Sequence, residues 1–313
     1  MRVVFMGTPD FAAVVLERLL LDGYPVVAVY TQPDKVAGRG QALVASPVKR
    51  VALTGKIPVM QPGSFKETGV VAQLAGLQPD IIVVAAFGQL LPPSVLGIPP
   101  YGCLNVHPSL LPQFRGASPV AAAILAGNEL TGVSVMLMDR GLDTGPVLAR
   151  AAIPILPQDT TGSLTVKLSG IGTSLLLDVL PRWWRRELVA KPQDEGQATC
   201  SRVFSKQDGE IDWRLPAVAI WRQVRAFQPW PGCYTHWQGK QLKIIEAVPL
   251  GGESTLKVGQ VIDQGKAGVM FGVSTGDGIL GVLRLQMEGK RAMSATEFLR
   301  GQRQFIGVVL GDP

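Results

Sequence analysis

The chain has 313 residues, of which 47% are hydrophobic and 17% are charged, and its formal net charge is +6. This length is typical of about two domains, and so much apolar material excludes a chain that is disordered throughout. A basic balance favours polyanionic partners, although the positive excess is spread along the chain rather than concentrated in one block.

In the first part of the chain, short apolar runs alternate with helical patterns. Runs that predict strands cover residues 2–6, 26–30, 57–61, 81–87, 103–107 and 131–138. Helical patterns occur at residues 11–19 and 164–184, and a loop is expected over residues 32–47. Continuous apolar runs suit parallel strands that are covered on both faces. The alternation therefore predicts an α/β fold with a doubly wound, mostly parallel, Rossmann-like sheet.

The pattern changes after a polar, non-periodic stretch at residues 187–207. One helical pattern, at residues 217–227, precedes five short strand-like runs separated by Gly and Pro. Short strands without crossover helices are typical of a small β-barrel, here expected to be OB-like. We therefore predict a catalytic domain at residues 1–188, a linker at 189–207 and a C-terminal β domain at 208–313.

Cysteine spacing and hydropathy limit the compartment and the metal chemistry. The three cysteines, Cys103, Cys200 and Cys233, form no CxxC or Cys/His pattern, so neither a disulfide framework nor a metal site is expected. The N-terminal segment lacks the charged and apolar regions of a leader. We also expect no membrane-spanning segment, since no window of about 18 residues is uninterruptedly apolar. These features predict a cytoplasmic protein.

Two polar motifs follow apolar strands. The first, N-V-H-P-S-L-L-P followed by R-G, contains Asn105 and His107; the second, D-R-G-L-D-T-G, contains Asp143. Ligands of open α/β sheets bind at the carboxyl ends of strands. Asn105 and His107 are two positions apart, so both side chains lie on one face of an extended strand. An amide donor, an imidazole and a carboxylate are suitable for acyl transfer, in which an oxyanion forms and protons move.

A purely structural interpretation remains open for each of these residues. A histidine at a strand end is more often structural than catalytic, and Asn or Asp beside a turn can serve the backbone alone. His107 is, however, one of only two histidines in the chain. The sequence contains neither G-x-G-x-x-G after its first strand nor a P-loop, which argues against dinucleotide and nucleoside triphosphate binding.

The two motifs together resemble those of the folate-dependent formyltransferases. Segments F-x-G-T-P-D-F-A at 5–12, T-Q-P-D-K-x-A-G-R-G at 31–40 and R-A-F-x-P-W-P-G at 225–232 are similar to the methionyl-tRNA branch of that superfamily. The resemblance covers nearly the whole chain. It implies transfer of a formyl group from 10-formyltetrahydrofolate to methionyl-initiator tRNA, without a metal.

The resemblance also implies roles for particular residues. Asn105, His107 and Asp143 are expected to be catalytic, and the tetrahydrofolate site is expected to be lined by Ser109, Leu110, Leu111 and Pro112. Contacts to tRNA are expected from Arg39, Lys35 and Lys206. Because an acceptor arm needs a large open face, we expect a monomer.

Three other functions are compatible with parts of the sequence. The same three catalytic side chains could deliver water to the formyl carbon, as in a 10-formyltetrahydrofolate hydrolase. A non-enzymatic RNA-binding module would explain the C-terminal domain and the basic loop but not the polar motifs. A sugar-nucleotide formyltransferase would use the same catalytic groups, although the whole-chain resemblance favours the tRNA branch.

Overall fold

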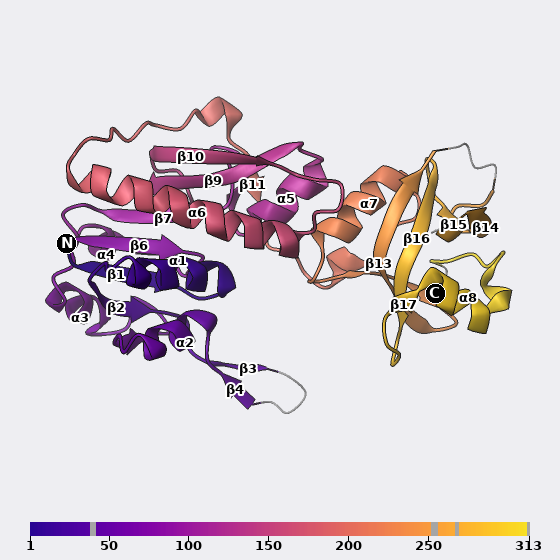
Figure 1. The fold of residues 1–313 in the computed structure, drawn as a ribbon, viewed down its shortest axis with the longest axis horizontal. Coiled ribbons are helices and arrows are strands. Elements are labelled where there is room, and N and C mark those ends of the chain that lie inside the picture. Colours follow the sequence, from indigo (N-terminus) through magenta and orange to yellow (C-terminus); the bar gives the residue numbers. More distant parts are fainter. Residues whose placement is uncertain (38–41, 252–255, 267–268, 312–313) are drawn as a thin grey trace. The chain divides into compact units, whose positions relative to one another are not determined.

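The computed structural model describes residues 1–37, 42–251, 256–266 and 269–311, and places the chain in two units (Figure 1). The first unit comprises Met1–Pro119, Leu130–Pro154 and Thr165–Ser201. The second comprises Val120–Glu129, Ile155–Leu164 and Arg202–Pro313. Most of the stretch that the sequence predicts to be a linker therefore lies in the first unit. Two short segments from earlier in the chain belong to the second.

The first unit is built on a seven-stranded sheet with the order β10-β9-β7-β6-β1-β2-β5. Its strands are β1 (Val3–Gly7), β2 (Val26–Tyr30), β5 (Val59–Met60), β6 (Ile81–Ala85), β7 (Cys103–His107), β9 (Leu130–Leu137) and β10 (Val147–Pro154). The five strands from β5 to β7 pair in parallel, whereas β9 and β10 are antiparallel additions at one edge. The predicted doubly wound, mostly parallel sheet is confirmed.

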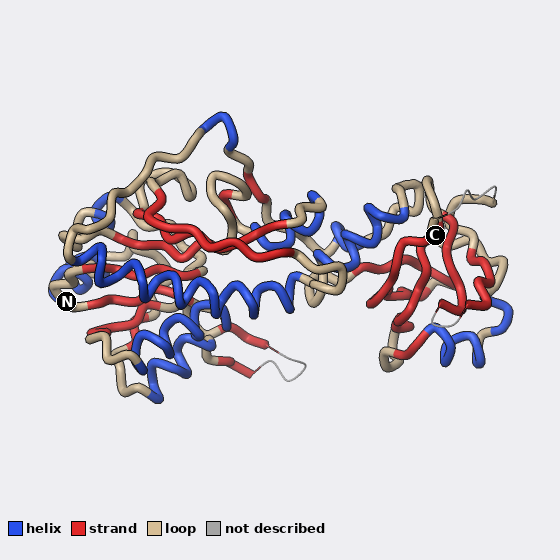
Figure 2. Tube along the Cα trace, turned by 45° about the horizontal axis from the view of Figure 1, so that its top comes forward, coloured by secondary structure: helices blue, strands red, loops and turns tan. Residues whose placement is uncertain are grey.

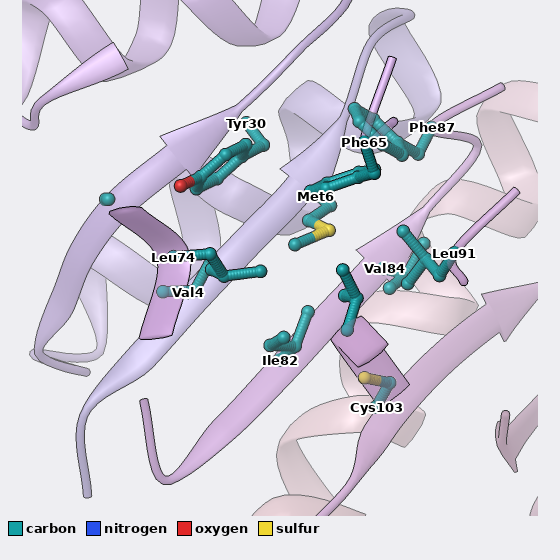
Figure 3. Packing of buried hydrophobic residues seen from close by; sticks show 12 residues of the cluster. Val4, Met6, Tyr30, Phe65, Leu74, Ile82, Val84, Phe87, Leu91 and Cys103 are labelled. Atoms are coloured by element: carbon teal, nitrogen blue, oxygen red, sulfur yellow. The ribbon is translucent and has the colours of Figure 1, made fainter. Parts of the chain in front are cut away.

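Helices cover both faces of this sheet, which explains why its central strands are continuously apolar. The helices of this unit are α1 (Asp10–Leu21), α2 (Pro47–Thr54), α3 (Val70–Gly76), α4 (Pro93–Leu96) and most of α6 (Thr161–Trp184), whereas α5 (Pro119–Ala126) belongs almost wholly to the second unit. On one face, Val4 and Met6 of β1 pack in a cluster with Leu74 of α3 (Figure 3). The same cluster contains Val95 of α4. Alternate residues Val3 and Phe5 are equally buried and point to the opposite face, where α1 contacts β1.

Helix α6 runs along the strands of the first unit (Figure 2). A Cβ atom on Gly172 would lie 2.9 Å from Val106 Cγ1 and 3.1 Å from Val133 Cγ1, so glycine permits the close approach of the helix to β7 and β9. By length and composition alone α6 could cross a membrane, but Leu168, Leu176 and Leu180 on its inner face are fully buried. Pro181 lies inside the helix near its end.

The loop expected over residues 32–47 contains a short hairpin. Strands β3 (Lys35–Ala37) and β4 (Ala42–Val44) pair antiparallel, with Lys35 opposite Val44. Two runs of three residues are too short to give a clear alternation of apolar and polar positions, so the sequence alone does not distinguish them from a loop. Arg39, predicted to contact tRNA, lies outside the described residues.

The second unit contains a six-stranded antiparallel sheet. Its strands are β12 (Cys233–Trp237), β13 (Lys240–Leu250), β14 (Val261–Lys266), β15 (Val269–Ser274), β16 (Ile279–Met287) and β17 (Met293–Ser294), and its later helices are α7 (Ala217–Ala226) and α8 (Ala295–Gly301). The main order is β12-β13-β16-β15-β14, with β17 pairing to β16. The antiparallel domain is confirmed, but no pairing between β12 and β14 closes a barrel within the described residues.

Candidate active site

Strand β7 carries two of the predicted catalytic side chains. It lies between β6 and β9, and all five of its residues are buried. Asn105 is paired with Val84 of β6 and Met136 of β9, and His107 is paired with Ser134 of β9. Asn105 is therefore held by strand pairing on both sides and His107 by pairing with β9, near the carboxyl end of a central strand.

Asp143 is the third predicted residue, and its carboxylate lies between the other two. Asn105 Nδ2 donates to Asp143 Oδ1 at 3.2 Å, and His107 Nδ1 lies 3.6 Å from Asp143 Oδ2. The same Oδ2 accepts a hydrogen bond of 2.8 Å from the backbone N–H of Gly116. Three residues separated by up to 38 positions therefore meet at one point.

The loop after β9 presents this carboxylate through an unusual backbone conformation. Asp143 has a φ of 55°, in the left-handed region that non-glycine residues rarely adopt. Asp139 braces the loop, because its Oδ1 accepts from the N–H of Gly141 at 3.0 Å and from Thr144 Oγ1 at 2.7 Å. Outlier backbones of this kind are concentrated at functional sites.

Burial and partners set the protonation of His107. Its side chain is only 5% exposed, and this burial lowers the pKa of the imidazole below its usual value. The Asp143 carboxylate and the Phe114 carbonyl oppose that shift without reversing it, so the neutral ring is favoured. Nε2 lies 3.0 Å from the carbonyl oxygen of Phe114, which can only accept, so we assign the proton to Nε2.

The turn after β7 contains the residues predicted to line a folate site. Ser109 is fully buried and its hydroxyl donates to the carbonyl of Gln113 at 2.6 Å. Leu111 is also buried, in a cluster with Met136 and Val147. Leu110 and Pro112 are partly exposed. Of the four, therefore, only these two present side-chain surface to a ligand.

Two of the residues predicted to bind tRNA, Lys35 and Lys206, are among the described residues. Lys35 is exposed on β3, and Lys206 is exposed in the second unit. Among the described residues, no group of three or more His, Cys, Asp and Glu side chains is placed to hold a metal ion.

Two contributors to the site were missed by reasoning from sequence. Gln193 donates to the carbonyl oxygens of Asp143 at 2.8 Å and Gly145 at 2.7 Å, and the guanidinium of Arg115 contacts Gln193 in turn. Arg115 belongs to the first polar motif, so its position was a signal. Gln193 lies in a polar stretch without periodicity, where nothing in the sequence indicates a contact with Asp143.

Comparisons with known proteins agree with this arrangement. Residues 1–180 match the family described as "Formyl transferase", and residues 204–303 match "Formyl transferase, C-terminal domain". A methionyl-tRNA formyltransferase of Dehalococcoides mccartyi is 50% identical, over 99% of each chain. One of Chloroflexus aurantiacus is 46% identical, over 96% of this chain and 97% of that one. The chain therefore belongs to the formyl transferase family, on the branch of the methionyl-tRNA formyltransferases.

Solved structures share the fold at low sequence identity. WlaRD, a sugar 3N-formyltransferase, superposes with a TM-score of 0.64 at 19% identity, over 93% of this chain and 99% of its own. HypX from Aquifex aeolicus, solved with tetrahydrofolic acid, has a TM-score of 0.62 at 17% identity over 96% of this chain. The chain spans about half the length of HypX, 47%. At these identities the likeness extends to the fold alone.

Proposed function

We propose that this protein transfers the formyl group of 10-formyltetrahydrofolate to the α-amino group of methionyl-initiator tRNA. The observation that carries the proposal is the meeting of Asn105, His107 and Asp143, all largely buried, near the carboxyl end of β7. Full-length relationship to methionyl-tRNA formyltransferases supports the choice of acceptor. The product would serve translation initiation in the cytoplasm.

The reaction needs groups that stabilise negative charge. The amine nitrogen attacks the formyl carbon, a C–N bond forms, and the formyl oxygen becomes an oxyanion. The Asn105 amide N–H and the His107 Nε2–H are the donors suited to this oxygen, and such donors are worth most in a buried site. In the free protein Nε2–H is satisfied by the Phe114 carbonyl at 3.0 Å. The formyl oxygen would replace that acceptor.

Proton movement completes the transfer. The intermediate collapses when the bond from carbon to N10 of the folate breaks, so the attacking nitrogen must lose a proton and N10 must gain one. An α-amino group has a pKa of about 7.7–8.0 in peptides, which leaves a neutral, nucleophilic fraction near pH 7. His107 is suited to carry the proton because its neutral ring, already protonated at Nε2, can accept at Nδ1, where Asp143 Oδ2 at 3.6 Å would stabilise the imidazolium before the proton passes to N10.

The two substrates would use different surfaces. We assign the folate to the turn at residues 109–112, with Leu110 and Pro112 offering side chains and the buried Ser109 and Leu111 holding the turn against β9. For tRNA we assign Lys35, Arg39 and Lys206, as phosphate contacts that set affinity rather than chemistry. The first unit would be catalytic and residues 208–313 would bind tRNA. We propose that the protein acts as a monomer and does not bind a membrane.

A product assay tests the proposal. Purified protein is incubated with 10-formyltetrahydrofolate, labelled in the formyl group, and methionyl-initiator tRNA. We expect the label in formyl-methionyl-tRNA, in proportion to tetrahydrofolate released. Label that appears instead as formate, with or without tRNA, would reject transfer in favour of hydrolysis. Binding of tRNA without release of label in any form would indicate a non-enzymatic RNA-binding module.

A further inference from the structure

The segment between α6 and the second unit is fastened along the first unit at both ends. Lys191 exchanges backbone hydrogen bonds with Val147, at 2.8 and 2.9 Å. Farther on, β11 (Cys200–Ser201) pairs in parallel with β8 (Arg115–Gly116). Between them, Thr199 Oγ1 accepts from the N–H of Phe114 at 2.8 Å. We call residues 191–201 the strap, since they follow the two loops that form the candidate active site.

One side chain of the strap reaches the backbone of the catalytic loop. Gln193 Nε2 donates to the carbonyl oxygens of Asp143 at 2.8 Å and Gly145 at 2.7 Å. Its Oε1 accepts from Arg115 Nε at 3.1 Å. Two donors and one acceptor on a single amide are therefore used at once. A carboxylate of the same size has no hydrogen to donate and would face two carbonyl oxygens.

Arg115 anchors this amide from the other loop. Its guanidinium is almost fully buried, and its Nη1 and Nη2 donate to the two carboxylate oxygens of Glu195, also on the strap, at 2.9 and 2.8 Å. A bidentate pair of this kind fixes orientation as well as distance. The direction of Arg115 Nε, and with it the Gln193 amide, is thereby set by the planar guanidinium.

The two neighbours of Arg115 in the sequence contact the catalytic side chains directly. Gly116, next to Arg115, donates to Asp143 Oδ2, and Phe114, on its other side, accepts from His107 Nε2. Gln193 binds the carbonyl of Asp143 itself, whose φ of 55° is a conformation that the rest of the loop must enforce. Displacing a catalytic group by about 1 Å can lower a rate by about 10².

We propose that Gln193, oriented by Arg115 and Glu195, is a positioning residue for formyl transfer that fixes the Asp143 carboxylate against His107. The inference rests on the catalytic role of Asp143 proposed above. It assigns a part in the reaction to the strap, which the sequence indicates only as a linker. The alternative is that Gln193 merely attaches the strap to the first unit.

Three variants separate these possibilities. Gln193→Ala removes all the bonds of the amide, and Gln193→Glu keeps its size but not its donors. Gln197→Ala is the matched control, because Gln197 is a glutamine of the same strap whose side-chain amide bonds, within the described part of the chain, only to Asp194, at 2.9 Å. For each, kcat, both KM values, the pH dependence of kcat and the thermal unfolding midpoint are measured.

We expect Gln193→Ala to lower kcat by about 10- to 100-fold with both KM values within about threefold, since a shifted carboxylate affects the transition state more than binding. Gln193→Glu is expected to lose as much, and the pH dependence of kcat to shift in both. Gln197→Ala is expected to match the unmodified protein. An unchanged kcat in Gln193→Ala, or equal losses in Gln193→Ala and Gln197→Ala, would overturn the proposal.

A spectroscopic measurement keeps this test separate from that of the function. The imidazole resonances of His107 are followed by NMR against pH in the unmodified protein and in each variant. The His107 titration is expected to shift in Gln193→Ala and not in Gln197→Ala, whether or not the protein transfers formyl groups. An unmodified protein that makes no formyl-methionyl-tRNA would contradict the proposed function, whereas an unmoved His107 titration would contradict the positioning role.

Discussion

Two arginines, one in each unit, are almost equally buried but are satisfied in different ways. Arg115 in the first unit is 5% exposed and donates hydrogen bonds to Glu195. These hydrogen bonds raise the pKa of its guanidinium. Arg225 in the second unit is 9% exposed, and burial lowers its pKa. It donates to the carbonyl oxygens of Asp159 at 2.8 Å and Leu156 at 2.9 Å.

The two arginines differ in the residues to which their hydrogen bonds connect them. From Arg115 the hydrogen bonds continue through Gln193 to the backbone carbonyl of Asp143, so that the buried guanidinium is connected to a residue of the candidate active site. From Arg225 they end at backbone, and the guanidinium stacks 4.3 Å from the centroid of Trp221. Burial of a charge therefore indicates function only when its partners lead to reactive groups; otherwise it indicates local structure.

The largest effect is expected at the carboxylate of Asp143, the residue whose backbone carbonyl accepts from Gln193. Asp143→Asn keeps the shape but removes the charge that would stabilise a protonated His107, so formyl transfer should fall by about 10²–10⁴. The rate is measured under single-turnover conditions, with circular dichroism to check the fold. Asp178→Asn, which removes a half-exposed carboxylate on α6 paired with Arg182, is expected to keep full activity. A rate within threefold in Asp143→Asn would remove Asp143 from the mechanism.

In the second unit the largest effect is expected on stability. Phe305 is fully buried, with ring centroids 4.8 Å from Trp237 and 4.9 Å from Phe298. Truncation to Ala leaves a cavity and should lower the free energy of unfolding by about 3–5 kcal/mol. Urea denaturation measures this. Trp230→Ala serves as the control because that ring is 60% exposed, and a change within about 0.5 kcal/mol is expected. Equal losses in both variants would show that the aromatic cluster does not stabilise the unit.

A direct test of the comparison replaces each buried arginine with lysine. Lysine keeps the charge but lacks the planar set of donors. Arg115→Lys should lower kcat by about tenfold, because Gln193 loses its partner. Arg225→Lys should instead cost about 1–3 kcal/mol of stability, with kcat per folded molecule unchanged. The comparison fails if both variants lose kcat equally, or if Arg115→Lys affects stability alone.

The smallest predicted effect concerns pH. Burial lowers the pKa of His107 in the folded protein, so the unfolded chain binds a proton at a higher pH, near its ordinary value of 6.5. Stability should therefore fall as the pH drops from about 6.5 towards the lower pKa of the folded state, by at most about 1.4 kcal/mol per pH unit. In His107→Gln this part of the pH dependence should disappear. Parallel stability curves for the two proteins between pH 7 and pH 5 would contradict it.

The sequence predicted those structural features that depend on local residue patterns. Continuous apolar runs identified the strands of the first unit, and the bounds predicted for β7 agree with the structure because strand and turn are both strongly marked there. The hairpin of β3 and β4 and the strand β10 were missed, since their short or mixed patterns acquire strand geometry from their partners. The roles of Asn105, His107 and Asp143 remain predictions, although the structure brings them together.

Contacts between residues far apart in the sequence could not be predicted. That Gln193 binds the carbonyl of Asp143, 50 positions away, depends on the path of the strap across the first unit. Likewise, the burial of Ser109 and Leu111 depends on Ser134 and Met136 of β9, which sequence spacing does not reveal. Closure of the C-terminal sheet also depends on pairing between distant strands, so strand-like runs alone do not decide it.

The most direct test of the account uses His107→Ala. Unmodified protein and variant are mixed in a single turnover with saturating 10-formyltetrahydrofolate and methionyl-initiator tRNA, and formyl-methionyl-tRNA is measured over time. We expect product from the unmodified protein and a rate lower by at least about 10² in a variant that remains folded and binds both substrates. Equal rates in the two proteins would contradict the assignment of the chemistry to this site.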